Sequence, residues 1–194
     1  MAELEAILPL QSFTAEEEEA AKAAGVGIRQ LDIAEKLLLR GNGSDAFKQA
    51  ASDVFGFAIP VAPNVAADKA LCCLCLSDSE WLVLSADNRP LAKALAEALS
   101  RQVAAVIDVS SAWAIIEVAG PNAEALLASG CSLDLHESSF PAGRCARGLI
   151  SHVEVVIYRR DSGEGYHILV DRSLATDLWN WLHGAATELA TVTA

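Results

Sequence analysis

The chain has 194 residues, of which 53% are hydrophobic and 21% charged, a composition typical of a globular protein. Its 14 lysines and arginines stand against 26 acidic residues, which gives a formal net charge of −12. Because proteins bind nucleic acid mainly by neutralising its phosphates with basic side chains, we expect no nucleic-acid partner. No apolar run approaches the ~20 residues that cross a bilayer, and the acidic start MAELEAILPL is unlike a secretory signal. We therefore expect a cytoplasmic protein without a membrane partner.

The first residues, 1–26, predict a loosely held arm followed by a helix. Thr14 is a suitable helix cap, and the glutamates Glu16–Glu19 fall in the first turns, where the helix dipole favours negative charge. Gly25 or Gly27 predicts the end of this helix.

Short strands and helices follow one another along the rest of the chain. The first half predicts extended chain towards the end of IRQLDIAEKLLLRGNG, a helix from Ser44 or Asp45 to about Val54, the irregular segment FAIPVAPN, the strands ALCCLCLS and EWLVLS, and the helix PLAKALAEALS. The second half predicts a strand ending at Asp108, the strand IIEVAG, a helix opened by Pro121, the loop CSLDLHESSFPAG, strands around RGLI, VEVVIYRR and YHILV with a hairpin at DSGEG, and the helix SLATDLWNWLHGA.

The two halves align strand on strand and helix on helix. EWLVLSADNRPLAKALAEAL matches GYHILVDRSLATDLWNWL in this way, and LLLRGNGSDAFKQAA matches IIEVAGPNAEALLAS. We therefore predict an α+β fold of duplicated β-α-β-β-α units, with sheets backed by helices. A single domain is expected over 27–190, with pseudo-repeats at about 27–102 and 103–190.

The cysteines predict core packing. Three of the five, Cys72, Cys73 and Cys75, lie in an apolar strand, where side chains alternate between faces. Cys73 and Cys75 should share one face and Cys72 the other. Structural zinc usually takes ligands in spaced pairs, whereas free cysteine behaves as a small hydrophobe. We expect no metal site and no disulfide framework.

Candidate nucleophiles and bases are present, but they do not form a catalytic pattern. No serine lies in a G-x-S-x-G turn, and the four histidines show no H-E-x-x-H arrangement. We therefore expect the histidines to be structural or surface residues, and no catalytic residue in this chain. The candidates considered are Ser110, Ser111, Cys131, Cys145, His136, His152, His167 and His183.

Three tryptophans are candidates for a partner interface: Trp113, Trp179 and Trp181. Residues two apart on a helix point roughly 200° from each other, so one of Trp179 and Trp181 should pack inward. The other is then exposed, and exposed aromatic side chains are enriched at interfaces. Packing of both rings into the core is the alternative.

Several segments in this order bring a family to mind, and the most distinctive part is G-C-S-L-D-L-H followed by F-P-A-G-R-C-A. The segments are LLLRGNG, GFAIPVAPN and EWLVLS, then IDVSSAWAIIEVAGPNAEALLASGCSLDLHESSFPAGRCARGLI and the closing RSLATDLWNWL. From about Leu31 onward the chain resembles the gamma subunit of heterotetrameric sarcosine oxidase. Its fold is accordingly expected to resemble the folate-binding domain of glycine-cleavage aminomethyltransferases.

The resemblance implies a role in a larger enzyme. Such complexes oxidise sarcosine to glycine, pass the one-carbon unit to tetrahydrofolate and reduce oxygen to hydrogen peroxide. Alpha, beta and delta subunits are the partners implied, with FAD, FMN, NAD and tetrahydrofolate in those subunits and no cofactor in this chain. The gamma subunit itself is expected to be a non-catalytic accessory subunit that supports assembly.

One departure from the aminomethyltransferases supports that expectation. Those enzymes address folate through an acidic residue in a segment resembling G-G-x-x-D-D. The matching GLISHVEVVIYRR has one glycine, Gly148, and no aspartate before Asp161, so Glu154 is its only carboxylate. We therefore assign no cofactor-binding residue. A stand-alone folate-binding aminomethyltransferase-like protein and an acidic α+β binding module of another pathway are the alternatives.

Overall fold

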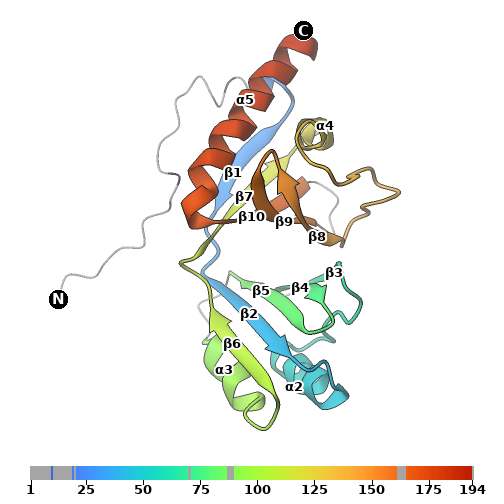
Figure 1. The fold of residues 1–194 in the computed structure, drawn as a ribbon, viewed down its shortest axis with the longest axis vertical. Coiled ribbons are helices and arrows are strands. Elements are labelled where there is room, and N and C mark those ends of the chain that lie inside the picture. The colour runs from blue at the N-terminus through green and yellow to red at the C-terminus, as the bar shows by residue number, and fades with distance from the viewer. Residues whose placement is uncertain are drawn as a thin grey trace, which may run out of the picture.

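Two five-stranded antiparallel sheets lie face to face between layers of helices in the computed structural model (Figure 1). The structure describes residues 10, 19, 21–69, 71–86, 90–160 and 165–193. In the order of their positions in space, the strands of the first sheet are β3 (Val65–Asp68), β4 (Cys72–Ser77), β5 (Glu80–Ser85), β2 (Glu35–Gly41) and β6 (Ala104–Asp108). Those of the second are β8 (Cys145–Ile150), β9 (Val153–Arg159), β10 (Gly165–Asp171), β7 (Trp113–Ala119) and β1 (Gly27–Leu31).

The helices cover the outer face of each sheet. Helices α2 (Asp45–Phe55) and α3 (Leu91–Ala98) pack on the first sheet, and α4 (Ala123–Ala128) and α5 (Ala175–Thr193) pack on the second. A short 3₁₀ turn, η1 (Arg172–Leu174), joins β10 to α5. No helix in the described ranges is both long and apolar enough to cross a membrane.

The duplication predicted from the sequence is visible in the topology. Each half of the chain runs strand, strand, helix, three strands, helix, and the sheet order β3-β4-β5-β2-β6 corresponds strand by strand to β8-β9-β10-β7-β1. The first strand of each half lies in the other half's sheet, because β1 pairs with β7 and β6 pairs with β2. The α+β fold is confirmed, and each unit contains more strands than the predicted β-α-β-β-α. The residue limits of the pseudo-repeats stay a prediction.

Two of the strands beyond the predicted unit, β1 and β3, come from segments without a strong strand pattern in the sequence. The stretch expected to be extended towards its end forms two separate strands, β1 and β2, which belong to different sheets. β3 follows two prolines and has the short sequence VAAD, which lacks the long alternating run of a typical strand. Pairing with β4 supplies the stability that the local sequence does not.

Local signals set the start of α2 and the end of the N-terminal helix where the sequence predicted them, whereas α5 continues to Thr193, beyond the predicted SLATDLWNWLHGA. Ser44 caps α2, and its hydroxyl oxygen accepts a hydrogen bond from the Phe47 backbone N–H at 3.2 Å. The N-terminal helix ends at Gly25, whose φ of +69° is a left-handed conformation that glycine adopts without strain. Its predicted cap, Thr14, lies outside the described residues, and so do residues 161–164 of the predicted DSGEG turn.

The cysteine strand β4 divides as expected between two apolar layers. Cys73 and Cys75 are fully buried against the helices, where they pack in one cluster with Trp81. Cys72 faces the opposite layer, between the two sheets. Cys145, from β8, is buried in that same layer.

Burial makes these thiols poor nucleophiles. It raises the pKa of Cys145 to about 12 and also raises that of Cys73, and alkylation requires the thiolate. We expect iodoacetamide at pH 8.5 to leave both unmodified in the native protein, while the half-buried Cys131 reacts. Peptide mass spectrometry over a time course measures this, with urea-unfolded protein as the control in which all five react. Modification of Cys145 ahead of Cys131 in the native state would contradict the expectation.

Candidate functional site

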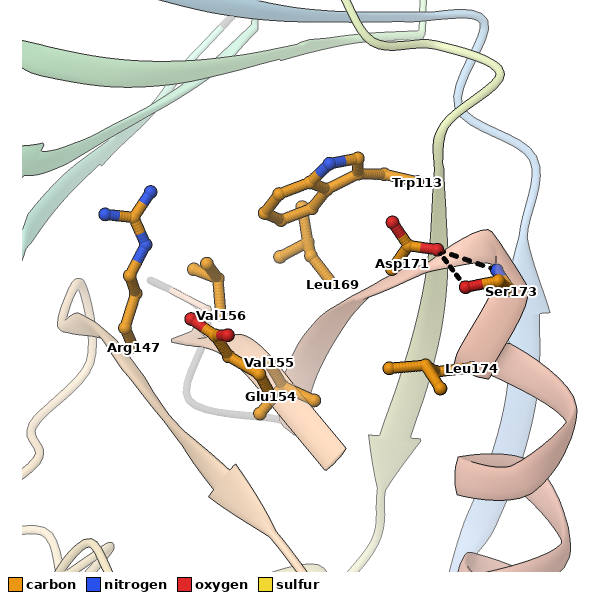
Figure 2. Close-up of a pocket in the computed structure, with 9 residues that line it drawn as sticks. All are labelled: Trp113, Arg147, Glu154, Val155, Val156, Leu169, Asp171, Ser173 and Leu174. Carbon is orange, nitrogen blue, oxygen red and sulfur yellow. Dashed lines mark hydrogen bonds between the residues drawn. The ribbon is translucent and has the colours of Figure 1, made fainter. Parts of the chain in front are cut away.

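A cleft of about 500 Å³ opens on the face of the second sheet that is turned toward the first (Figure 2). It lies where the apolar layer between the sheets ends, so part of the inner face of the second sheet is left uncovered. The lining residues are Trp113, Arg147, Glu154, Val155, Val156, Leu169, Asp171, Ser173 and Leu174.

Strand alternation places these side chains together. Residues two apart on a strand share a face, so Trp113, Glu154 and Leu169 all project to the inner side of the sheet. Their neighbours Ala114 and Val155 project to the helix side and belong to the outer core. The cleft therefore joins β7 to the three consecutive strands β8, β9 and β10.

The polar groups of the cleft are mostly engaged in structural contacts. One Asp171 carboxylate oxygen accepts hydrogen bonds from the Ser173 backbone N–H at 2.8 Å and from its hydroxyl at 2.6 Å. These bonds cap η1 and hold the pKa of Asp171 below its usual value. Arg147 forms an ion pair with Glu80 of the first sheet, and Arg40 lies 2.8 Å from the same carboxylate. Glu154, by contrast, is exposed at the cleft.

The lining of this cleft is suited to apolar contact. Tryptophan, leucine and valine form an apolar wall, and neither histidine nor cysteine is among the described residues that line it. The only hydroxyl among the described lining residues, that of Ser173, donates its hydrogen bond to a carboxylate that also caps a helix turn. Such a surface can accept an apolar side chain or the apolar part of a small molecule.

The three predicted interface tryptophans occupy different environments. Trp113 is half-buried and forms one wall of the cleft (Figure 2). Trp179 packs inward, as expected for one of the helical pair, and is only 3% exposed. Trp181 is half-buried rather than fully exposed, because its ring lies so close to Gly130 that an added Cβ would come within 2.2 Å of it.

The candidate nucleophiles and bases are dispersed over the molecule. The Ser110 hydroxyl oxygen accepts a hydrogen bond from the Lys36 backbone N–H, and His136 is exposed beside Ser138. None of the eight candidates named from the sequence lines the cleft in the described structure. Among the described residues, no group of three or more His, Cys, Asp or Glu side chains is positioned to hold a metal ion.

Sequence reasoning missed a charge cluster on the same inner face, around the buried Glu117 of β7. Its carboxylate forms an ion pair with Arg29 and lies 3.7 Å from Arg160 and 3.5 Å from His167 Nε2. Burial alone would raise the pKa of Glu117, but the hydrogen bond and charge of Arg29 outweigh it and the pKa is lowered. Burial, followed by the charge of Arg160, lowers the pKa of His167. These residues come from separate segments and have no linear signature.

His167 should make the protein less stable in mild acid. Its pKa is about 6.5 when unfolded and lower when folded, so below pH 6.5 the unfolded state binds a proton that the native state resists. The free energy of unfolding should therefore fall between pH 7 and 5, and less steeply in His167→Asn. Urea unfolding across this range measures the slope, with the exposed His152→Asn as the matched control. Equal slopes for wild type and His167→Asn would contradict this assignment.

The ion pairs that join the sheets at Glu80 should be strongly coupled. Arg40→Met or Arg147→Met alone should cost up to about 1 kcal/mol, because the other arginine still neutralises the buried carboxylate. The double variant should lose about 1–3 kcal/mol more than the sum, because Glu80 is then buried without a cation. Urea unfolding of the wild type, the two single variants and the double variant measures this coupling energy.

The exposed pair Lys93–Glu97, whose charged atoms lie 3.9 Å apart, provides the control cycle. Its coupling should be only about 0.3–0.5 kcal/mol, as is usual for exposed helical pairs. Additive losses for Arg40 and Arg147 would mean that Glu80 does not depend on the two cations.

The fold of this chain places it in a known structural class. The structure superposes on the glycine cleavage system aminomethyltransferase T from Bartonella henselae with a TM-score of 0.63 at 16% identity, covering 87% of this chain and 48% of that one. The shared fold is therefore that of the aminomethyltransferases, as the sequence predicted. A chain of the heterotetrameric sarcosine oxidase from Corynebacterium sp. U-96 has a TM-score of 0.80 at 25% identity, covering 91% of this chain and 94% of that one.

Sequence comparison identifies the family. The gamma subunit of sarcosine oxidase from Arthrobacter sp. is 28% identical over 174 residues, covering 88% of this chain and 85% of that protein. The gamma subunit from Corynebacterium sp. strain U-96 is 27% identical over 177 residues, covering 89% and 86%. The profile of the sarcosine oxidase gamma subunit family matches residues 40–188. This chain belongs to that family, which confirms the resemblance seen in its sequence.

Proposed function

We propose that this chain is the accessory gamma subunit of a heterotetrameric sarcosine oxidase and supplies no catalytic group of its own. The observation that carries the proposal is the combination of family membership with nearly full coverage of a chain of that tetramer. By contrast, the chain covers less than half of the aminomethyltransferase, whose fold it shares. A subunit that keeps part of an enzyme's architecture is suited to a scaffolding role.

The cleft supports the same assignment. Glu154, the only carboxylate in the segment that matches the acidic folate motif, lies exposed at the cleft. Arg147, the one arginine among the lining residues that the structure describes, is held by Glu80 and so contributes to joining the sheets. A catalytic acid must be held in position by its surroundings. The side chain of Glu154 is exposed rather than enclosed in the described structure.

The proposal extends to partners and cofactors. We infer alpha, beta and delta subunits as partners in the cytoplasm, with FAD, FMN, NAD and tetrahydrofolate held by those subunits. The complete complex would convert sarcosine to glycine and transfer the one-carbon unit to tetrahydrofolate. Within this chain, Trp113 and Trp181 are the proposed interface tryptophans with ring area still accessible, whereas Trp179 contributes by holding α5 in place.

Assembly of the complex tests the proposal directly. Affinity-tagged chain, co-expressed with the other three subunits, should purify with them as one complex that shows flavin absorbance and sarcosine-dependent peroxide production. The chain purified alone should show neither property. A chain that remains monomeric in the presence of the other subunits would contradict the proposal.

Calorimetry separates the accessory role from the folate-binding alternative. Titration of the isolated chain with tetrahydrofolate up to high micromolar concentration should produce no binding heat. Heat that is present in wild type and lost in Glu154→Gln would favour a folate-binding protein. The exposed Glu97→Gln on α3 is the matched control for loss of a surface carboxylate.

A further inference from the structure

The outer edge of β6 is an unpaired strand edge. β6 is the last strand of the first sheet and pairs only with β2, in a continuous register from Leu37 opposite Asp108 to Gly41 opposite Ala104. Within the described part of the chain, no strand pairs with its other side. Alternate backbone N–H and C=O groups of β6 therefore point away from the sheet, as at any antiparallel edge.

The side chains of this edge are apolar and exposed. Val103, just before the strand, is 78% exposed, and Ile107 is 43% exposed. Ala104 and Val106 point to the other side and pack against the helix-side core. The segment VAAVID contains no lysine and no proline, which are residues that commonly protect natural edge strands from pairing.

The corresponding edge of the second sheet is protected. There β1 takes the position that β6 takes in the first sheet, and it carries Arg29, whose guanidinium forms an ion pair with Glu117. A charge held within an edge strand in this way opposes pairing with another strand. Of these two equivalent edges, only β6 combines open backbone groups with exposed aliphatic side chains.

We propose that β6 receives an extended segment of another subunit of the complex by strand addition. This inference rests on the proposed function, because it requires a hetero-oligomeric partner. The segment would run beside Ala104–Asp108 over about 17 Å, the length of five strand residues. Backbone hydrogen bonds would hold it in register, and apolar side chains at alternate positions would cover Val103 and Ile107.

The charge of the chain favours a heterologous occupant over a second copy. Each copy has a net charge of −12, so pairing two β6 edges brings together two strongly acidic bodies. The strand also ends in the exposed Asp108. The segment that fits this edge is therefore neutral or basic.

Hydrogen–deuterium exchange on the complete complex tests this directly. The amides of Ala104–Asp108 that point outward should exchange rapidly in the isolated chain and at least tenfold more slowly in the complex. The amides bonded to β2 should be protected in both samples. Such alternating protection distinguishes an added strand from a subunit that only covers the face.

A charged variant provides the second measurement. Ile107→Lys should leave the melting temperature of the isolated chain nearly unchanged, because the side chain is partly exposed, but weaken its binding to the other subunits at least tenfold. Val61→Lys is the matched control, because Val61 is 57% exposed and lies outside the strand. Binding of Ile107→Lys that equals wild type would overturn the proposal. If Ile107→Lys does not fold, the exchange pattern of wild type decides alone.

The remaining outcomes are also decisive. A wild-type chain that joins the complex with unchanged exchange at β6 overturns strand addition and leaves the proposed function intact. Concentration-dependent dimers of the isolated chain, abolished by Ile107→Lys, with no protection from the other subunits, would assign the edge to a second copy and overturn the proposal. A wild-type chain that forms no complex at all overturns the proposed function and this inference with it.

Discussion

Burial of one apolar layer between the two sheets holds this molecule together. Leu82 from the first sheet and Ile115, Val156 and Leu169 from the second are all at most 1% exposed in it. Removing this surface from water is the main favourable contribution to joining the two sheets. The same contact keeps the two sheets close enough for β1 and β6 to change places. β1 belongs to the first half of the chain but pairs in the second sheet, and β6 belongs to the second half but pairs in the first sheet.

The same contact determines which surfaces are open. The edges of β3 and β8 are joined to each other, since the Ala66 backbone N–H donates to the Gly143 carbonyl at 2.8 Å and the Cys145 N–H donates to Asn64 at 3.1 Å. The two remaining edges are therefore β1, which carries the Arg29–Glu117 ion pair, and β6, which is apolar. Where the apolar layer ends, the cleft beside Trp113 begins. A member of the gamma subunit family built in this way leaves few sheet edges, among the described strands, on which a partner could pair.

Much of the fold was predictable because its signals are local. The cap at Ser44, the alternating faces of Cys72 and Cys73, and the matched order of the two halves follow from short-range geometry. The added strand β3 was missed because its stability comes from pairing. The cleft was predicted only in part: Trp113 and Glu154 were singled out, but their proximity was not, because they lie on different strands.

The sequence by itself determined the family, the α+β class, the duplication and the absence of a G-x-S-x-G or H-E-x-x-H motif. These properties follow from the local order, the spacing and the types of the residues. Only the tertiary structure decided which sheet each strand joins, that Glu80 binds arginines from both sheets, and that Glu117 gathers Arg29, Arg160 and His167. The reason is that these contacts join residues far apart in the chain. Strand pairing brings Arg40 to Glu80 and both Arg29 and His167 to Glu117, whereas the contact between the two sheets brings Arg147 to Glu80.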